Sequence, residues 1–322
     1  MRLTCTEIRQ DTQDINTYWF EADQTLDFIP GQFLPIGVEI QGEVEQRCYS
    51  LASQPGGKEC SLTIKRVTDG LVSNFLADNL KVGDELEALP ASGEFNANLY
   101  KEQPLLMLSA GCGITPVYSM LVARLAEDPN ADIFFVHSAS TAKDRLYVEE
   151  LEALASKYEN LKLVWCVSQS SEFESRLSQD VLANLDESLS SRVALMCGPN
   201  GYMESAQEWL KALGMPEAQI HHEQFQAAIA ELEASDGAHT LSVNGQAVSI
   251  EGEQTVLDAL ESEGLPIFAA CRAGVCGSCR CKGDKDKLVS STQGPLTDEE
   301  VEQGYFLACA SQVNDNMFVE IG

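Results

Sequence analysis

Short runs in which hydrophobic and polar residues alternate fill the first 100 or so positions. Alternation with a period of two is typical of strands that bury one face, and glycine and proline between the runs are typical of turns. Many short strands with regular turns predict an antiparallel barrel or sandwich, followed by a short helix from about Leu71 to Leu80. The runs are Leu3 to Arg9, Ile15 to Phe20, Phe33 to Ile40, Gln46 to Leu51 and Cys60 to Val67.

The pattern changes between about residues 104 and 225, where continuous apolar runs alternate with amphipathic segments. This alternation predicts βαβ units and a parallel sheet. The expected strands are Leu105–Ser109, Ile133–His137, Leu161–Val167 and Val193–Met196, and the expected helices begin at Pro116, run near Leu146–Lys157 and cross Gly201–Leu213.

An acidic stretch, residues 226–238, separates this segment from a third one. The third segment opens with a hairpin signal, Asn244-Gly245 between two alternating runs, and continues into a helix from about Thr255 to Glu263. We therefore expect a β domain over residues 1–102, an α/β domain over 103–226, a linker over 227–238 and a small domain over 239–322.

The amino-acid composition limits the number of domains and the cellular compartment that we expect. The 322 residues suit two or three domains, and no run of about 18 apolar residues predicts a membrane span. The first residues lack the apolar core of a signal peptide, and eleven cysteines are scattered along the chain. Reduced thiols in a cytoplasmic compartment fit this pattern best.

The chain is strongly acidic, with 50 acidic against 21 basic residues and a formal net charge of −29. Nucleic acids and anionic membranes are therefore poor partners. Two interpretations of the acidity stay open, namely electrostatic steering of a partner with a basic surface and adaptation to a salty environment or solubility.

Four cysteines near the C-terminus carry the strongest chemical signal. Their spacing is C-x4-C-x2-C followed by a fourth cysteine after 29 residues, which is the plant-type ligand spacing for a 2Fe–2S cluster. Zinc is the nearest alternative, but zinc ribbons repeat a close pair of cysteines and the fourth one here has no close partner. Gly274 and Gly277 would let backbone amides approach the sulfur atoms. The expected ligands are Cys271, Cys276, Cys279 and Cys309.

Two motifs in the β domain suit a flavin. In the first, Arg47-Cys48-Tyr49-Ser50, Arg47 can neutralise a phosphate, Tyr49 can lie against the ring system and Ser50 can hydrogen-bond its edge. The second, Gly70-Leu71-Val72-Ser73, leads into the expected helix, whose N-terminal amides suit a pyrophosphate. Each motif alone is weak.

Two further motifs follow expected strands of the α/β domain. Gly111-Cys112-Gly113-Ile114-Thr115-Pro116 is a glycine-containing turn into a helix, with Thr115 placed to cap the helix and Pro116 at its first position. Such a turn is where a dinucleotide phosphate binds, although it is not the G-x-G-x-x-G fingerprint. Cys197-Gly198-Pro199 would meet the same edge of the sheet, where a small residue such as Cys197 leaves room for a nicotinamide.

Taken in order, these motifs resemble the ferredoxin–NADP reductase superfamily, and more narrowly its reductases that have a C-terminal plant-type ferredoxin domain. The resemblance covers essentially the whole chain. It implies a flavin-binding antiparallel β-barrel, a nucleotide-binding α/β domain with a parallel sheet and a β-grasp ferredoxin domain. Because Gly70-Leu71-Val72-Ser73 resembles the FAD-type motif, the flavin is expected to be FAD rather than FMN.

The resemblance also implies roles for single residues. Ser50, Tyr49 and Cys197 would act at hydride transfer, and an acid and an aromatic residue, here Glu223 and Phe225, often face the flavin in such proteins. Glu223 could equally be an exposed residue of a final strand.

Electrons are expected to pass from NADH to FAD, then to the cluster and to an acceptor protein. NADH is expected rather than NADPH, because no arginine stands at the tip of the turns after His137 and Val167, although Lys143 is near. The resemblance suggests hybrid-cluster protein as the acceptor, with a Rieske-type oxygenase or demethylase component as the alternative.

Overall fold

The computed structural model describes residues 1–170, 173, 176–186, 188–225, 237–252, 254–272 and 274–321. The chain forms two compact units, one from residues 1–42 and 49–224 and the other from residues 43–48 and 225–322. The expected linker lies almost entirely outside the described residues.

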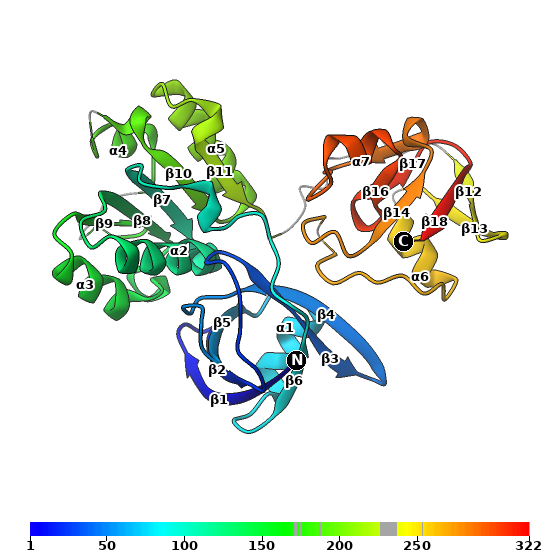
Figure 1. Cartoon of the computed structure of the whole chain (residues 1–322), viewed down its shortest axis with the longest axis horizontal. Coiled ribbons are helices and arrows are strands. Elements are labelled where there is room, and N and C mark those ends of the chain that lie inside the picture. The colour runs from blue at the N-terminus through cyan, green and yellow to red at the C-terminus, as the bar shows by residue number, and fades with distance from the viewer. Residues whose placement is uncertain are drawn as a thin grey trace. The chain divides into compact units, whose positions relative to one another are not determined.

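The N-terminal strands form a six-stranded antiparallel sheet in the order β4-β3-β6-β1-β2-β5 (Figure 1), of which all but residues 43–48 of β4 belong to the first unit. Its core is built from alternate residues of the strands, so Leu3 and Cys5 of β1 are buried while their neighbour Arg2 is exposed. The elements are β1 (Arg2–Gln10), β2 (Ile15–Ala22), β3 (Phe33–Ile40), β4 (Glu43–Ser50), β5 (Glu59–Lys65), α1 (Leu71–Asn79) and β6 (Glu85–Ala88).

A five-stranded parallel sheet in the order β11-β10-β7-β8-β9 follows in the same unit. Strand β7 shows why its sequence is continuously apolar, because Leu105 and Met107 belong to one core while Leu106 and Leu108 belong to the other. Helices α2 and α3 cover the first face and α4 and α5 the second (Figure 1). The elements are β7 (Leu105–Ala110), α2 (Ile114–Glu127), β8 (Ile133–Ala139), α3 (Val148–Lys157), β9 (Leu161–Val167), α4 (Gln179–Ala183), β10 (Val193–Cys197), α5 (Asn200–Ala212) and β11 (Ile220–Glu223).

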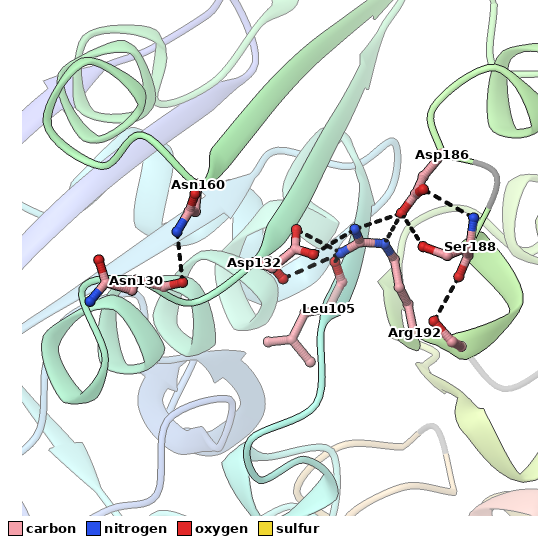
Figure 2. Close-up of polar contacts among 8 residues, drawn as sticks. Leu105, Asn130, Asp132, Asn160, Asp186, Ser188 and Arg192 are labelled. Atoms are coloured by element: carbon pink, nitrogen blue, oxygen red, sulfur yellow. Dashed lines mark hydrogen bonds and ion pairs between the residues drawn. The ribbon is translucent and has the colours of Figure 1, made fainter.

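Arg192 ties together the N-terminal edge of this sheet (Figure 2). Its buried guanidinium donates to Asp132 Oδ2 at 2.8 Å and to Asp186 Oδ2 at 2.7 Å, and it lies over the Phe134 ring. It also donates to the Leu105 carbonyl, where β7 begins. These contacts join the starts of β7, β8 and β10, so the opposite, C-terminal edge is left for ligands.

The second unit contains a five-stranded mixed sheet in the order β13-β12-β18-β14-β16, with α6 packed on its core, and a small β15–β17 ladder. The Asn244-Gly245 hairpin forms as expected, with Asn244 and Gly245 both at positive φ. The elements are β12 (Ala238–Val243), β13 (Gln246–Glu251), α6 (Val256–Ser262), β14 (Arg280–Gly283), β15 (Leu288–Ser290), α7 (Asp298–Glu302), β16 (Tyr305–Leu307), β17 (Ser311–Val313) and β18 (Met317–Ile321).

The architecture confirms the expected fold class of an antiparallel β sheet, a parallel α/β sheet and a small mixed domain. Two helix starts differ from expectation. Helix α2 begins at Ile114 rather than Pro116, because a 3-10 turn over Gly111–Gly113 runs directly into it. Helix α3 begins at Val148 rather than Leu146, because Tyr147 is left-handed, with φ 54°. No helix in the described ranges is both long and apolar enough to span a membrane.

Candidate functional site

The C-terminal edge of the parallel sheet brings the two nucleotide motifs together. Cys197 at the end of β10 is in register with Ser109 of β7 on one side and with Glu223 of β11 on the other. A Cβ added to Gly113 would lie 2.2 Å from the Cys197 carbonyl oxygen, so only glycine lets the turn approach this strand. The placement of both motifs at one edge is therefore as the sequence predicts.

The start of α2 corrects one detail of that prediction. Thr115 does not cap the helix, because its hydroxyl donates to the Cys112 carbonyl oxygen from inside the first turn. Gly113 is the capping residue, Pro116 is the third residue of the helix, and no side chain caps this terminus. Backbone amides without a side-chain acceptor at a helix N-terminus suit a phosphate group.

Glu223 is a buried acid at the same edge, 8% exposed, and is not the exposed strand residue that the sequence left open. Burial raises its pKa to about 8, while a hydrogen bond with the Ser50 hydroxyl opposes that shift. Its Oε2 atom is buried and has no hydrogen-bond partner among the described residues. A buried carboxyl whose second oxygen has no hydrogen-bond partner fits a site where a bound ligand supplies the missing hydrogen bond.

Cys197 contributes a neutral group here. It is fully buried, and burial together with the nearby Glu223 carboxyl raises the pKa of its thiol well above the ordinary value. Cys197, Ser50 and Glu223 come from β10, β4 and β11, so the structure joins residues that lie far apart in the sequence.

The other expected flavin residues lie in the β domain. Gly70 precedes α1, and no side chain caps this helix either. Val72 is buried in the core and Leu71 is exposed, so these two residues offer a ligand mainly their backbone. Ser73 is buried and its Oγ accepts from the Val67 amide. Tyr49 packs against the β-domain core.

Arg47 and Phe225 show no ligand geometry of their own. Arg47 donates from Nη1 to Glu45 Oε2 at 3.2 Å and to the Gln46 carbonyl at 2.6 Å, so it is held on its own strand. The Phe225 side chain is 42% exposed. Their cofactor roles stay predictions.

The four expected cluster ligands are arranged with amide donors around them. Cys279 Sγ and Cys309 Sγ are 3.2 Å apart, and Gly274 N donates to Cys309 Sγ at 3.2 Å. Val275 N donates to Cys271 Sγ at 3.4 Å, and Cys276 Sγ lies 3.0 Å from Ser278 Oγ. None of the eleven cysteines, all of which lie in the described ranges, is part of a disulfide. Amide donors to sulfur are a feature of iron–sulfur sites.

The loop geometry supports this assignment. Gly274 has φ +68°, and an added Cβ would lie 2.4 Å from Thr292 Cγ2, so no other residue fits there. Within the described ranges, no three His, Cys, Asp or Glu side chains converge as a single metal ion requires. A 2Fe–2S core spreads its four thiolates over two irons, so it does not need such convergence. The amide donors around the sulfur atoms and the restricted space at Gly274 both fit a 2Fe–2S cluster.

Sequence reasoning missed Arg272, which follows the first ligand. It is left-handed, with φ 53°, and its guanidinium grips both Glu261 oxygens of α6 at 2.9 and 2.5 Å. A non-glycine residue in this region costs free energy, so the ion pair holds a strained turn of the cluster loop. The position beside Cys271 was the only signal in the sequence.

Sequence reasoning also missed Arg145. Its guanidinium stacks on the rings of Trp165, at 4.8 Å, and Phe173, at 4.4 Å. Its Nε donates to the Ala142 carbonyl. The residue therefore lies in the turn region after β8, where the sequence suggested no arginine.

Family models cover each part of the chain. An oxidoreductase FAD-binding domain matches residues 3–96, an oxidoreductase NAD-binding domain matches 107–208 and a 2Fe–2S iron–sulfur cluster binding domain matches 241–314. The glycine betaine monooxygenase reductase subunit of Chromohalobacter salexigens is 34% identical, over 98% of this chain and 94% of its own length. The chain belongs to the ferredoxin–NADP reductase superfamily. Its place is among the reductases with a C-terminal 2Fe–2S domain, and FAD, NAD and the cluster are its cofactors.

Other similarities agree. NADH oxidoreductase HCR of Escherichia coli K12 is 32% identical over 96% of this chain and 94% of its own length. The solved structure of phthalate dioxygenase reductase matches with a TM-score of 0.69, covering 100% of this chain and 98% of that one. Its 19% identity speaks for the fold alone.

Proposed function

We propose that this reductase carries electrons from NADH through FAD and the 2Fe–2S cluster to an acceptor protein. The observation that carries the proposal is the cysteine loop, where backbone amides donate to the sulfur atoms of the expected ligands. The same chain brings its two expected nucleotide-binding motifs together at one edge of the parallel sheet. The proposed domain limits are residues 1–102, 103–226 and 239–322. Eleven cysteines with no disulfide among them in the described structure support a reducing, cytoplasmic compartment.

NADH would bind at the C-terminal edge of the parallel sheet. Its pyrophosphate would accept hydrogen bonds from the Gly111–Gly113 turn and the start of α2, near Ile114, Thr115 and Pro116. The small Cys197, with Gly198 and Pro199 after it, would leave space for the nicotinamide. Because the Cys197 thiol is neutral, it would place no negative charge beside the path of the hydride.

FAD would lie against the β domain, held by Arg47, Tyr49, Ser50 and the Gly70–Ser73 segment, with Phe225 as a further contact. When bound, a flavin converts the two-electron chemistry of nicotinamide to the one-electron chemistry of the cluster. Glu223 would hold a proton at neutral pH, and the Ser50 hydroxyl would hydrogen-bond the edge of the ring system. The protonated Glu223 would place no buried negative charge in the site at neutral pH.

NADH remains the proposed donor rather than NADPH. Arg145 is a cationic side chain that could pair with a 2′-phosphate near the turn after β8. Its guanidinium, however, already stacks on two aromatic rings and donates to the Ala142 carbonyl. A 2′-phosphate would also meet a chain with a net charge of −29. Stopped-flow flavin reduction should give the higher specificity constant with NADH, and a preference for NADPH would contradict this proposal.

The cluster assignment is tested by Cys309→Ala with Cys281→Ala as its matched control. Cys281 is a buried cysteine of β14 in the same domain but outside the four-ligand set. Cys309→Ala should lose the visible absorbance and EPR signal of the cluster while still reducing ferricyanide with NADH. Cys281→Ala should keep both. A normal 2Fe–2S EPR signal in Cys309→Ala would overturn the ligand assignment.

Two acceptors are proposed, each with its own support. The relatives named as monooxygenase reductase subunits support an oxygenase component, here a glycine betaine monooxygenase. The relative named NADH oxidoreductase HCR, together with the sequence resemblance, supports hybrid-cluster protein. Anaerobic mixing with NADH and each purified acceptor separates them, because only the cognate protein should be reduced at catalytic rates.

A further inference from the structure

A continuous path of hydrogen bonds crosses from the antiparallel sheet to helix α3. Tyr147 Oη lies 2.6 Å from Thr63 Oγ1, which lies 2.6 Å from Thr17 Oγ1. Thr17 donates to Asp11 Oδ2 at 2.6 Å, and Arg9 donates to Asp11 Oδ1 at 2.7 Å and to Glu150 Oε1 at 2.8 Å. Since Tyr147 and Glu150 both stand at the start of α3, the path closes into a ring, which we call the barrel–helix ring. Its members are Arg9, Asp11, Thr17, Thr63, Tyr147 and Glu150.

The direction of these hydrogen bonds is fixed. Each hydroxyl has one hydrogen to donate, and Thr17 uses its own on the Asp11 carboxylate. Thr63 must therefore donate to Thr17, and Tyr147 must donate to Thr63. The chain of hydrogen bonds from Tyr147 therefore ends on the Asp11 carboxylate, which also pairs with Arg9. Each hydrogen bond in it is polarised toward that negative charge.

The hydroxyl members of the ring lie in a buried interface, whereas the Arg9 and Glu150 side chains are partly exposed. Thr17, Thr63 and Tyr147 are all buried, and the Tyr147 ring packs against Tyr118 with centroids 4.6 Å apart. Leaving a buried polar group without a hydrogen-bond partner costs free energy, so the favoured arrangement is the one in which every hydroxyl of the ring keeps its partner. The ring therefore specifies one orientation of the helix against the sheet, which apolar contacts alone would not.

Tyr147 is the strained member. Its φ of 54° and ψ of 35° are left-handed, and it precedes α3 without any side-chain cap. Such a backbone is costly for a tyrosine and persists only where its surroundings hold it. The hydroxyl contact with Thr63 and the Tyr118 packing are the contacts that do so here.

We propose that Tyr147 is a positioning residue for hydride transfer. The ring joins β1, β2 and β5 of the flavin-binding half to α3 of the nucleotide-binding half, and so sets how closely a bound nicotinamide approaches a bound flavin. A hydride, one proton with two electrons, passes from NADH to the flavin and leaves NAD⁺, and its rate depends steeply on that approach. This inference rests on the proposed function.

The test is Tyr147→Phe, which keeps the aromatic packing and removes only the donor, with Tyr158→Phe as its control. Tyr158 is a half-buried tyrosine that ends the same helix, outside the ring. In anaerobic stopped-flow experiments at saturating NADH, the limiting rate of flavin reduction should fall about tenfold in Tyr147→Phe. The Kd for NADH and the flavin content should stay within about twofold, since neither binding site loses a contact. Tyr158→Phe should match the wild type.

A second pair of variants guards against a folding defect. Thr63→Val removes the middle hydroxyl and should slow flavin reduction as Tyr147→Phe does, whereas Thr63→Ser keeps a hydroxyl there and should restore the rate. Unchanged limiting rates in Tyr147→Phe and Thr63→Val would overturn the proposal, as would equal slowing in Thr63→Ser. If NADH fails to bleach the flavin of the wild type, the proposed function itself fails, which is a distinct result.

Discussion

Glu223 shows what burial does to one carboxyl group. Its pKa of about 8 means that the folded protein keeps this proton in a range where an exposed glutamate, with a pKa of about 4.3, has lost it. Between these two values the folded state binds more protons than the unfolded state. The free energy of unfolding therefore falls as the pH rises through this window, and the loss is complete above it.

Replacing Glu223 with Gln should remove this pH dependence. The wild type should lose up to about 1.4 kcal/mol of unfolding free energy per pH unit from this group, and Glu223→Gln should lose none of it. Urea unfolding of the flavin-loaded protein between about pH 5 and 8 measures the difference. Glu208→Gln changes an exposed carboxyl of α5 and serves as the control. Parallel pH curves for Glu223→Gln and the wild type would contradict the buried assignment.

Arg272 poses a second residue-level question, whether its ion pair holds a strained backbone. Glu261→Gln should weaken the grip on Arg272 and shorten the lifetime of the cluster several-fold, because the left-handed turn beside Cys271 then relaxes. Arg272→Gly should keep the cluster, since glycine adopts φ 53° without strain. Bleaching of the visible absorbance under air, with EPR as a second readout, follows the loss.

The control for this pair is Glu263→Gln, which changes an exposed carboxyl at the end of the same helix. It should lose its cluster at the wild-type rate. If Arg272→Gly loses the cluster as fast as Glu261→Gln does, the ion pair matters for its charge and not for the backbone that it holds.

At the scale of elements, periodicity foresaw most strands and helices. The β7 and β10 runs were recognised because continuous apolar stretches suit strands buried on both faces, and both strands form there. The short elements β6, α4, α7 and β15 to β18 were not foreseen. Strands of three to five residues carry too little periodicity, and their pairing depends on partners far along the chain.

The candidate site divides in the same way. The four cysteines could be proposed as cluster ligands because three of them follow a recognisable local spacing, and backbone amides donate to the sulfur atoms of at least two of the four. The burial of Glu223 could not be foreseen, since it results from the pairing of β11 with β10 beside Cys197. The left-handed Arg272 and Tyr147 are likewise consequences of tertiary contacts and not of their neighbours in sequence.

The Arg192 network (Figure 2) holds the parallel sheet at its N-terminal edge, opposite the proposed nucleotide site. Arg192→Met keeps most of the apolar stem but leaves Asp132 and Asp186 without their shared cation. Because the two aspartates keep access to solvent, the expected loss is that of the charged hydrogen bonds, about 1.5–3 kcal/mol, rather than that of an unpaired buried charge. Urea unfolding followed by circular dichroism measures it.

Lys211→Met is the matched comparison for Arg192→Met. It breaks the exposed Lys211–Glu217 pair of the same domain, and such surface pairs contribute little to stability because solvent screens them. Equal losses in the two variants would show that the Arg192 contacts have no special weight at the sheet edge.

At the scale of the whole molecule, the net charge of −29 admits two explanations, partner steering and general solubility. The two explanations differ in the salt dependence that they predict for electron transfer to the acceptor protein. A basic acceptor protein would be drawn toward this chain at low ionic strength, and salt would screen that attraction. A small anionic acceptor such as ferricyanide would be repelled, and salt would relieve the repulsion.

The second-order rate of electron transfer to the cognate acceptor should therefore fall by about tenfold or more as salt rises from about 50 to 500 mM, if the charge steers docking. The NADH–ferricyanide rate should rise over the same range, which shows that salt has not damaged the flavin or nucleotide sites. A cognate rate that is flat while the ferricyanide rate rises would assign the acidity to solubility or a salty environment. Steady-state turnover at subsaturating acceptor, with NADH held saturating, isolates the docking step.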